Sequence, residues 1–142
     1  MKDVDVFIGT HHDAEALFGI DAEPQESAAL LRRRFGFRAV AYTLRESPSA
    51  SVNRFSGLLC DAKGCDSGLA YDMRMVDRIG GGDAFSGGII YGHLMGWTRR
   101  RTVEFAAAAG CLKHSVPGDF NLVSLAEVQQ LVKTGGAGTV QR

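Results

Sequence analysis

The order of apolar and polar residues along the chain predicts strands separated by helices. Residues 4–8 and 71–77 alternate in part and are rich in β-branched or aromatic side chains, which favours strands. Residues 38–44 are mostly apolar, as expected of a strand that is covered on both faces. The more polar residues 51–59 are interpreted as a strand near an edge of the sheet.

Helices are predicted where apolar residues recur at helical spacing between typical start and stop residues. The first ends at Gly19, the second begins at Pro24, and the last has Ser124 and Glu127 as a capping box. The predicted helices cover residues 13–18, 24–35, 82–96, 101–115 and a segment after residue 124. Residues 62–68 are interpreted as a turn, and residues 134–142 as a loose tail.

Strands that alternate with helices predict an α/β fold, with a mainly parallel sheet and helices on both faces. Residues 1–142 are treated as part of one domain, since no linker divides them. The helix over residues 82–96 is apolar around most of its circumference, so we expect it to be buried. Its residues Gly87, Gly88 and Gly92 are expected to allow close approach of a neighbouring backbone.

Charge and hydropathy exclude several functional classes. Lys and Arg number 16, and so do Asp and Glu, so the chain has no basic field for nucleic acid. The run Arg32, Arg33 and Arg34 is interpreted as a solvated helix end, where cations suit the helix dipole. No apolar run is long enough for a membrane span, and the N-terminus has no signal-peptide core. We therefore expect a cytoplasmic protein without membrane or nucleic-acid partners.

The cysteines and the adjacent histidines give no metal-binding pattern. Three cysteines without C-x-x-C spacing predict free thiols in a reducing compartment, although a Cys60–Cys65 disulfide is left open. His11 and His12 are neighbours in the sequence and do not face one site on a helix, so we expect surface histidines.

Glycine is the informative residue type. Of 18 glycines among 142 residues, seven lie between residues 80 and 96. Gly80, Gly81 and Gly82 stand between a predicted strand and a predicted helix, where successive N–H groups form an anion-binding nest. Asp83 follows the nest and suits a base that takes a proton from a hydroxyl while the nest holds a transferred group. A tight turn with Asp83 as a capping carboxylate explains the same residues, and both interpretations stay open here.

Residues 77–85 resemble the second signature of the ribokinase-like (PfkB) carbohydrate kinases, which has the form D-T-x-G-[AG]-G-D-x-F, with Arg78 in place of Thr. Residues 5–9 are similar to the strand before the N-x-x-E motif of that family. Residues 41–47, 105–115 and 117–121 resemble segments of its 2-keto-3-deoxygluconate kinase branch.

The resemblance implies a role for each matching residue. Asp83 would be the catalytic base, and Gly80, Gly81 and Gly82 would form the anion hole. Matches with the ATP site are Thr43, Leu44 and Arg45, the last where Gly is commoner, and the adenine would lie beside Ala107 and Ala108. Asp77 and Ile79 match positions that hold a monovalent cation in some members, and Asp119 falls in a loop near the substrate.

Two departures from the family pattern stand out. Thr10 and Asp13 stand where the family has the Asn and Glu of N-x-x-E, a motif that helps organise Mg²⁺ and phosphate, so the resemblance implies that Asp13 is associated with Mg²⁺. The first glycine signature, the sugar-binding residues and the lid have no match, so the chain resembles only the C-terminal portion of a kinase. We therefore expect an incomplete ribokinase-like fold in which an edge strand and apolar helix faces lack partners, so that the chain self-associates through the sheet edge or the missing-half surface, or a strand of a neighbour docks on that edge.

The function implied is ATP-dependent phosphorylation of 2-keto-3-deoxygluconate, with little activity in this chain alone. Two alternatives remain: a kinase for another sugar such as fructose or ribose, and a non-catalytic remnant that binds nucleotide or a partner protein.

Overall fold

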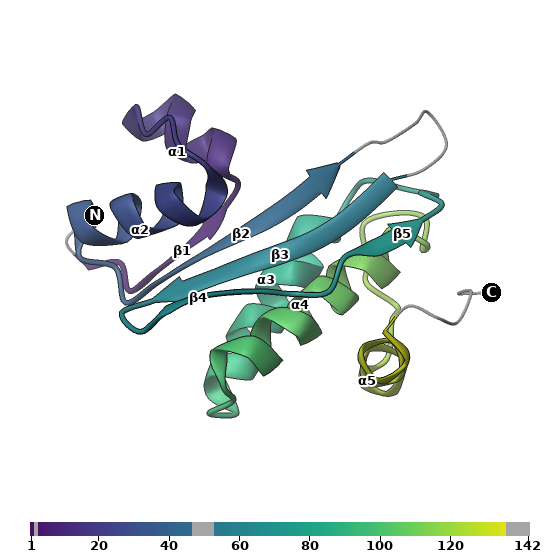
Figure 1. Cartoon of the computed structure of the whole chain (residues 1–142). Helices are drawn as coiled ribbons and strands as arrows, with labels where there is room; N and C mark the ends of the chain where they lie inside the picture. The colour runs from purple at the N-terminus through teal and green to yellow at the C-terminus, as the bar shows by residue number, and fades with distance from the viewer. Residues whose placement is uncertain (2, 47–52, 136–142) are drawn as a thin grey trace.

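The computed structural model describes residues 1, 3–46 and 53–135 (Figure 1). Ten helices and strands follow one another in the described residues. In chain order they are β1 (Val6–Gly9), α1 (His11–Phe18), α2 (Pro24–Phe35), β2 (Ala39–Glu46), β3 (Asn53–Asp61), β4 (Gly64–Ser67), β5 (Tyr71–Met73), α3 (Gly81–Leu94), α4 (Arg99–Lys113) and α5 (Leu125–Thr134). The tail expected over residues 134–142 falls largely outside the described residues.

The described strands form one mixed sheet in the order β1-β2-β3-β4, with β5 also paired to β3. Only β1 and β2 are parallel; β2 with β3, β3 with β4 and β3 with β5 are antiparallel. The α/β class is confirmed, whereas the prediction of a mainly parallel sheet is wrong for these strands. The reason is connectivity: α1 and α2 cross from β1 to β2, but only short connections join β2, β3 and β4, and parallel pairing needs a longer crossover.

Helices cover both faces of the sheet, as the sequence predicts. Figure 1 shows α1 and α2 on one face, and α3 and α4 on the other with α5 beyond α4. Each layer has its own core: Phe37 and Tyr42 belong to the α1–α2 side, and Phe55 and Phe85 belong to the α3–α4 side. The sheet therefore separates two hydrophobic clusters.

Capping residues explain where the helices begin. Thr10 and Asp13 form a capping box, so α1 begins at His11, two residues earlier than predicted. Pro24 occupies the first turn of α2, and Ser124 with Glu127 caps α5, both as predicted.

Helices α3 and α4 pack closely because α3 carries glycines on the facing side. A Cβ at Gly88 would lie 2.6 Å from the Ala106 Cα, and one at Gly92 would lie 2.6 Å from the Thr102 side chain. The close approach is confirmed there, but Gly87 faces open space. The prediction that α3 is buried is wrong for one side of the helix, where Leu94 is 76% exposed and no described element covers it.

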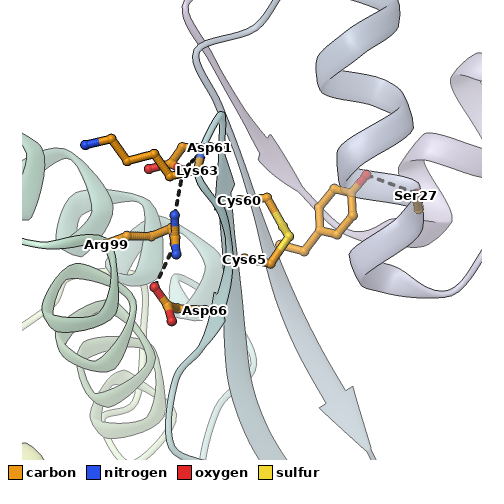
Figure 2. Close-up of a disulfide and its surroundings, with 8 residues drawn as sticks. Ser27, Cys60, Asp61, Lys63, Cys65, Asp66 and Arg99 are labelled. Carbon is orange, nitrogen blue, oxygen red and sulfur yellow. Dashed lines mark hydrogen bonds and ion pairs between the residues drawn. A yellow bond between two sulfur atoms is a disulfide. The ribbon is translucent and has the colours of Figure 1, made fainter.

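The hairpin of β3 and β4 replaces the turn predicted over residues 62–68. At the tip of the hairpin, the Asp61 side chain accepts a hydrogen bond from the Lys63 N–H, and the short β4 begins at the next residue. The register places Cys60 opposite Cys65, and their sulfurs are bonded at 1.97 Å (Figure 2). The expectation of three free thiols is therefore wrong for this pair, because the sequence did not reveal a hairpin register that brings them together. The buried Cys111 remains a free thiol.

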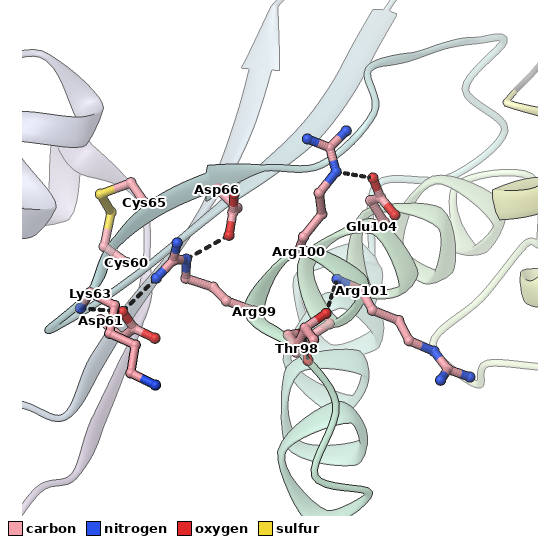
Figure 3. Close-up of polar contacts among 11 residues, drawn as sticks. Cys60, Asp61, Lys63, Cys65, Asp66, Thr98, Arg99, Arg100, Arg101 and Glu104 are labelled. Carbon is pink, nitrogen blue, oxygen red and sulfur yellow. Dashed lines mark hydrogen bonds and ion pairs between the residues drawn. A yellow bond between two sulfur atoms is a disulfide. The ribbon is translucent and has the colours of Figure 1, made fainter.

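Arg99 ties this hairpin to the first turn of α4. Its guanidinium contacts Asp61 and donates to Asp66 at 2.7 Å (Figure 3). The next residue, Arg100, pairs with Glu104 on its own helix. The Arg99 contacts thus link the sheet to the helix layer that carries the candidate site.

Within the part of the chain that the structure describes, no helix has the length and hydropathy needed to cross a membrane. The His11 and His12 rings lie with centroids 4.0 Å apart, and no cluster of metal-ligating side chains surrounds them among the described residues.

Candidate active site

The three glycines form the N-terminal end of α3. Gly80 is the N-cap residue with φ of 77°, in the left-handed region that favours glycine, and no side chain caps this helix. The first hydrogen bond of the helix joins the Ala84 N–H to the Gly80 carbonyl. The N–H groups of Gly81, Gly82 and Asp83 therefore project beyond the helix end, an arrangement suited to an anion.

Asp83 lies in the first turn of α3 with its side chain exposed. No hydrogen-bond or ion-pair partner holds its carboxylate among the described residues. It lines an open groove of about 650 Å³ together with Gly80 and Asp119. The structure thus brings together the predicted base, the nest and the predicted substrate residue. The alternative in which Asp83 caps the helix is not what the structure shows, because the N-cap position belongs to Gly80.

A buried imidazole lies against the nest. His114 is 0% exposed at the end of α4, and a Cβ at Gly81 would lie 2.2 Å from its Cε1. The ring nitrogen Nδ1 is 2.5 Å from the Gly110 carbonyl, so Nδ1 carries the proton and donates it. The other nitrogen, Nε2, therefore accepts from the Arg45 guanidinium at 2.9 Å. Burial, with the charge of Arg45 as a further cause, lowers the pKa of His114 and keeps the ring neutral.

Two arginines bring positive charge to this end of the sheet. Burial is the main cause that lowers the pKa of Arg45, and the like charge of Arg78 lowers it further. Neither arginine has a carboxylate partner among the described residues, although Arg45 lies over the Phe55 ring. Two neighbouring cations without a counterion, beside open N–H groups, make an environment that attracts an anion.

The loop before the nest is fastened to the turn after α4. The Asp77 carboxylate accepts hydrogen bonds from the N–H groups of Ile79 and Gly118, at 3.0 and 2.8 Å. These two backbone bonds are the main causes that lower the pKa of Asp77. From the other side, Lys113 donates to the Ile79 carbonyl at 2.8 Å. The residues predicted to hold a monovalent cation are thus already engaged within the protein.

The predicted nucleotide residues divide between the two faces of the sheet. Arg45 faces α4, and Thr43 shares that face because side chains alternate along a strand. Leu44 packs against the core on the α1–α2 side, away from the nest. Ala107 and Ala108 are 0% exposed, so the structure does not bring them to a ligand surface. Their small side chains instead let α4 pack tightly against its neighbours, which the sequence pattern could not distinguish from an adenine contact.

The magnesium-associated residue is engaged in helix capping. Asp13 accepts from the Thr10 N–H at 2.7 Å and from the Thr10 hydroxyl at 2.8 Å. Among the described residues no group of three or more acidic, His or Cys side chains could hold a metal ion. Any Mg²⁺ here would therefore depend on oxygens of a bound phosphate.

Sequence reasoning missed the roles of Lys113 and His114. The available signal was their position: two basic residues follow the apolar run 105–112 shortly before Pro117, and basic residues are rarely buried without a partner. Among their partners, the Ile79 carbonyl and the Arg45 guanidinium come from other elements, and only the fold reveals those contacts.

Comparison with known proteins matches the chain to one family. A family model described as "pfkB family carbohydrate kinase" matches residues 1–124. Among curated proteins, the chain is 28% identical over 135 residues to 2-dehydro-3-deoxygalactonokinase of Haloferax volcanii. That match covers 95% of this chain and 40% of the relative.

Solved structures agree. The 2-dehydro-3-deoxygluconokinase of Thermotoga maritima matches with a TM-score of 0.87 and 40% identity, over 92% of this chain and 41% of that one. A putative 2-keto-3-deoxygluconate kinase from Enterococcus faecalis matches with a TM-score of 0.81 and 27% identity, over 97% of this chain and 43% of that one. This chain therefore spans about two fifths of the length of the proteins it resembles.

Proposed function

Since the chain belongs to the pfkB family of carbohydrate kinases, we propose that it carries the phosphoryl-transfer side of an ATP-dependent kinase for 2-keto-3-deoxygluconate. The observation that carries the proposal is the unpartnered Asp83 carboxylate directly after the open N–H groups of the nest. The similarity to relatives named for 2-dehydro-3-deoxy sugar acids supports the choice of substrate. A cytoplasmic location is part of the same proposal.

In this proposal the transfer divides between the nest and the base. The N–H groups of residues 81–83 donate to the equatorial oxygens of the transferred phosphoryl group, where negative charge is spread in the transition state. Asp83 accepts the proton of the sugar hydroxyl as that oxygen forms its bond to phosphorus and the bond to ADP breaks. One carboxylate and a fixed set of donors suffice, because phosphoryl transfer depends mainly on positioning and charge stabilisation.

Positive charge for the remaining phosphates comes from Arg45 and Arg78. The hydrogen bond to the neutral His114 orients the Arg45 guanidinium. Because His114 carries no charge, the positive charge of Arg45 is not neutralised and can attract an anion. Mg²⁺, when bound, neutralises phosphate charge; Asp13 is the carboxylate we assign to it, acting alongside phosphate oxygens and water. Asp119, which lines the same groove as Asp83, is assigned to substrate binding.

Binding of ATP to the 142-residue chain, measured by calorimetry, is the first test. We expect weak binding, and a chain that binds no ATP contradicts the assignment of the nest and arginines. Coupled ATP-consumption assays with 2-keto-3-deoxygluconate, fructose and ribose then show whether the chain alone phosphorylates any of these sugars. ATP binding with no sugar-dependent consumption is the result we expect of the chain alone, whereas consumption that depends on one sugar would identify that sugar as its substrate.

A chimera tests the base itself. This chain replaces the matching segment of the Thermotoga maritima enzyme, which supplies the remaining length. Asp83→Asn is expected to lower kcat by roughly 10²–10⁴-fold, because the proton acceptor is lost. Asp119→Asn is the matched control, since it removes a second carboxylate from the same groove and is expected to change KM more than kcat. Unchanged turnover in the Asp83→Asn chimera would show that this carboxylate is not the base.

A further inference from the structure

Lys113 is a charged side chain with no access to water. It lies in the last turn of α4 and is 0% exposed. Its ammonium donates to the carbonyls of Ile79 at 2.8 Å, Val116 at 3.2 Å and Gly118 at 2.7 Å. An ammonium has three protons and no acceptor, so these three carbonyls satisfy it completely. The removal of a charge from water is costly, and a complete set of oxygen partners is what makes such a site stable.

The carbonyls come from two separate loops. Ile79 immediately precedes the nest, whereas Val116 and Gly118 belong to the turn after α4. Asp77 bridges the same two loops through their N–H groups. One cation and one carboxylate therefore hold the loops together, the cation through carbonyls and the carboxylate through N–H groups.

The lysine stem also lies directly beneath the nest. A Cβ at Gly80 would lie 2.9 Å from the Lys113 Cε and 2.9 Å from the Asp119 carbonyl. The position of Gly80 sets where the N–H groups of α3 begin. Displacement of the ammonium would thus move the nest together with the Asp119 side of the groove.

A carbonyl cage beside a carboxylate is also the kind of site that binds K⁺ or NH₄⁺. This cage cannot hold the lysine ammonium and a free cation together, because two unit charges at contact distance repel strongly in a buried site. The residues present therefore do not fit the exchangeable monovalent cation expected at Asp77 and Ile79.

We propose that the Lys113 ammonium is a tethered monovalent cation that holds the nest in place, so that this protein needs no K⁺ to order the site. Lys113 is a positioning residue, since it contacts the loop and not the reacting atoms. The effect on phosphate binding rests on the proposed function. The effect of Lys113 on folding does not rest on it, so the tethered-cation proposal and the proposed function can fail separately.

Thermal unfolding of the 142-residue chain tests the proposal. Unfolding is measured in KCl, NH₄Cl, NaCl and choline chloride at one ionic strength of ~0.15 M. Wild type is expected to have the same Tm in all four salts. The Tm of Lys113→Ala is expected to fall by on the order of 10 °C in choline chloride, because three carbonyls lose their charged donor. A substantial part of that loss should return in KCl or NH₄Cl, since a free cation can enter the vacated cage.

Two controls make the result specific. Lys133→Ala removes an exposed lysine from α5 and is expected to change the Tm little in any salt. Lys113→Met removes the charge but keeps the stem volume, so it should be destabilised without recovery in K⁺. A wild-type Tm that rises in K⁺, or a Lys113→Ala variant with no preference among the salts, overturns the proposal.

A measurement on the wild-type chain covers the case in which Lys113→Ala does not fold. A buried, fully bonded ammonium exchanges its protons slowly, so ¹⁵N NMR should show one lysine NH₃⁺ signal at neutral pH that connects to Lys113 Cε. That signal should be unchanged when Na⁺ is replaced by K⁺. Its absence, or its displacement by K⁺, counts against the tethered cation. ATP titrations in NaCl and KCl complete the test: equal affinities support the proposal, K⁺-dependent affinity contradicts it, and loss of binding in both salts contradicts only the proposed function.

Discussion

A single methyl group at Gly81 should destabilise the candidate site far more than the same group at Gly82. A Cβ at Gly81 would lie 2.2 Å from His114 Cε1 and 2.6 Å from its Nε2, which is well inside van der Waals contact. The ring cannot swing away freely, because it is fully buried and bonded at both nitrogens. Gly82 has open space around its Cβ position and no positive φ.

The structure sets the size of this effect. Overpacking of a buried position costs about 1–3 kcal/mol, and each hydrogen bond that the displaced imidazole loses adds about 0.5–1.5 kcal/mol. Gly81→Ala should therefore lower the free energy of unfolding by roughly 2–4 kcal/mol, or about 10 °C in Tm for a chain of this size. Gly82→Ala should be neutral or stabilising by up to ~1 kcal/mol, because Ala favours helix.

Urea and thermal unfolding followed by circular dichroism measure both variants. Equal stability of Gly81→Ala and Gly82→Ala would refute the packing of His114 against the nest. A double-mutant cycle sharpens the test, since His114→Ala opens the space that the new methyl group needs. The combined variant should then lose less than the sum of the single losses, by about 1 kcal/mol or more. Additive losses would show that the two residues do not touch.

Three further predictions follow from other contacts. Arg99→Met should lower the free energy of unfolding by about 1–3 kcal/mol, because it leaves two half-buried carboxylates without their partner. Arg100→Met should change it by no more than about 0.5 kcal/mol, and equal losses of the two variants in urea unfolding would contradict this prediction. Burial lowers the pKa of His114 in the folded chain, so its contribution to the free energy of unfolding should be fully present above the ordinary pKa of about 6.5 and should fall as the pH drops below that value. If His114→Asn leaves the dependence of stability on pH unchanged, this contribution is refuted. Wild type should self-associate at high concentration through the exposed α3 side, and Leu94→Glu should restore a monomer by light scattering; a wild type that stays monomeric rules this out.

Local sequence signals predicted the elements of the fold well where a physical rule acts within a few residues. The capping box of Ser124 and Glu127, the proline at the start of α2 and the glycine-rich start of α3 all formed as expected. The prediction of strand direction was wrong because direction depends on the length of the connections between elements. Only six residues separate Glu46 from Asn53, too few for the crossover that a parallel pair requires.

The candidate site was predictable in its covalent order but not in its packing. Residues 77–85 placed the nest and Asp83 at a helix start, because those features lie next to one another in the sequence. The Cys60–Cys65 disulfide and the burial of Ala107 depend on register and on helix packing, which single residues do not encode. Lys113 belongs to the same class, since one of its three carbonyl partners, Ile79, lies 34 residues away in the sequence.

The nucleotide side of the site and the uncovered side of the molecule are supported by different contacts. Asp77, Lys113 and His114 hold the nest through residues that all lie between Arg45 and Gly118. Strand β1, which forms one edge of the described sheet, and the exposed Leu94 take no part in those bonds. A segment or second molecule that covers β1 would therefore not be needed to form the phosphate site. ATP binding without sugar turnover is accordingly the behaviour we expect of this chain, and changes at Leu94 should alter its assembly while leaving its ATP affinity unchanged.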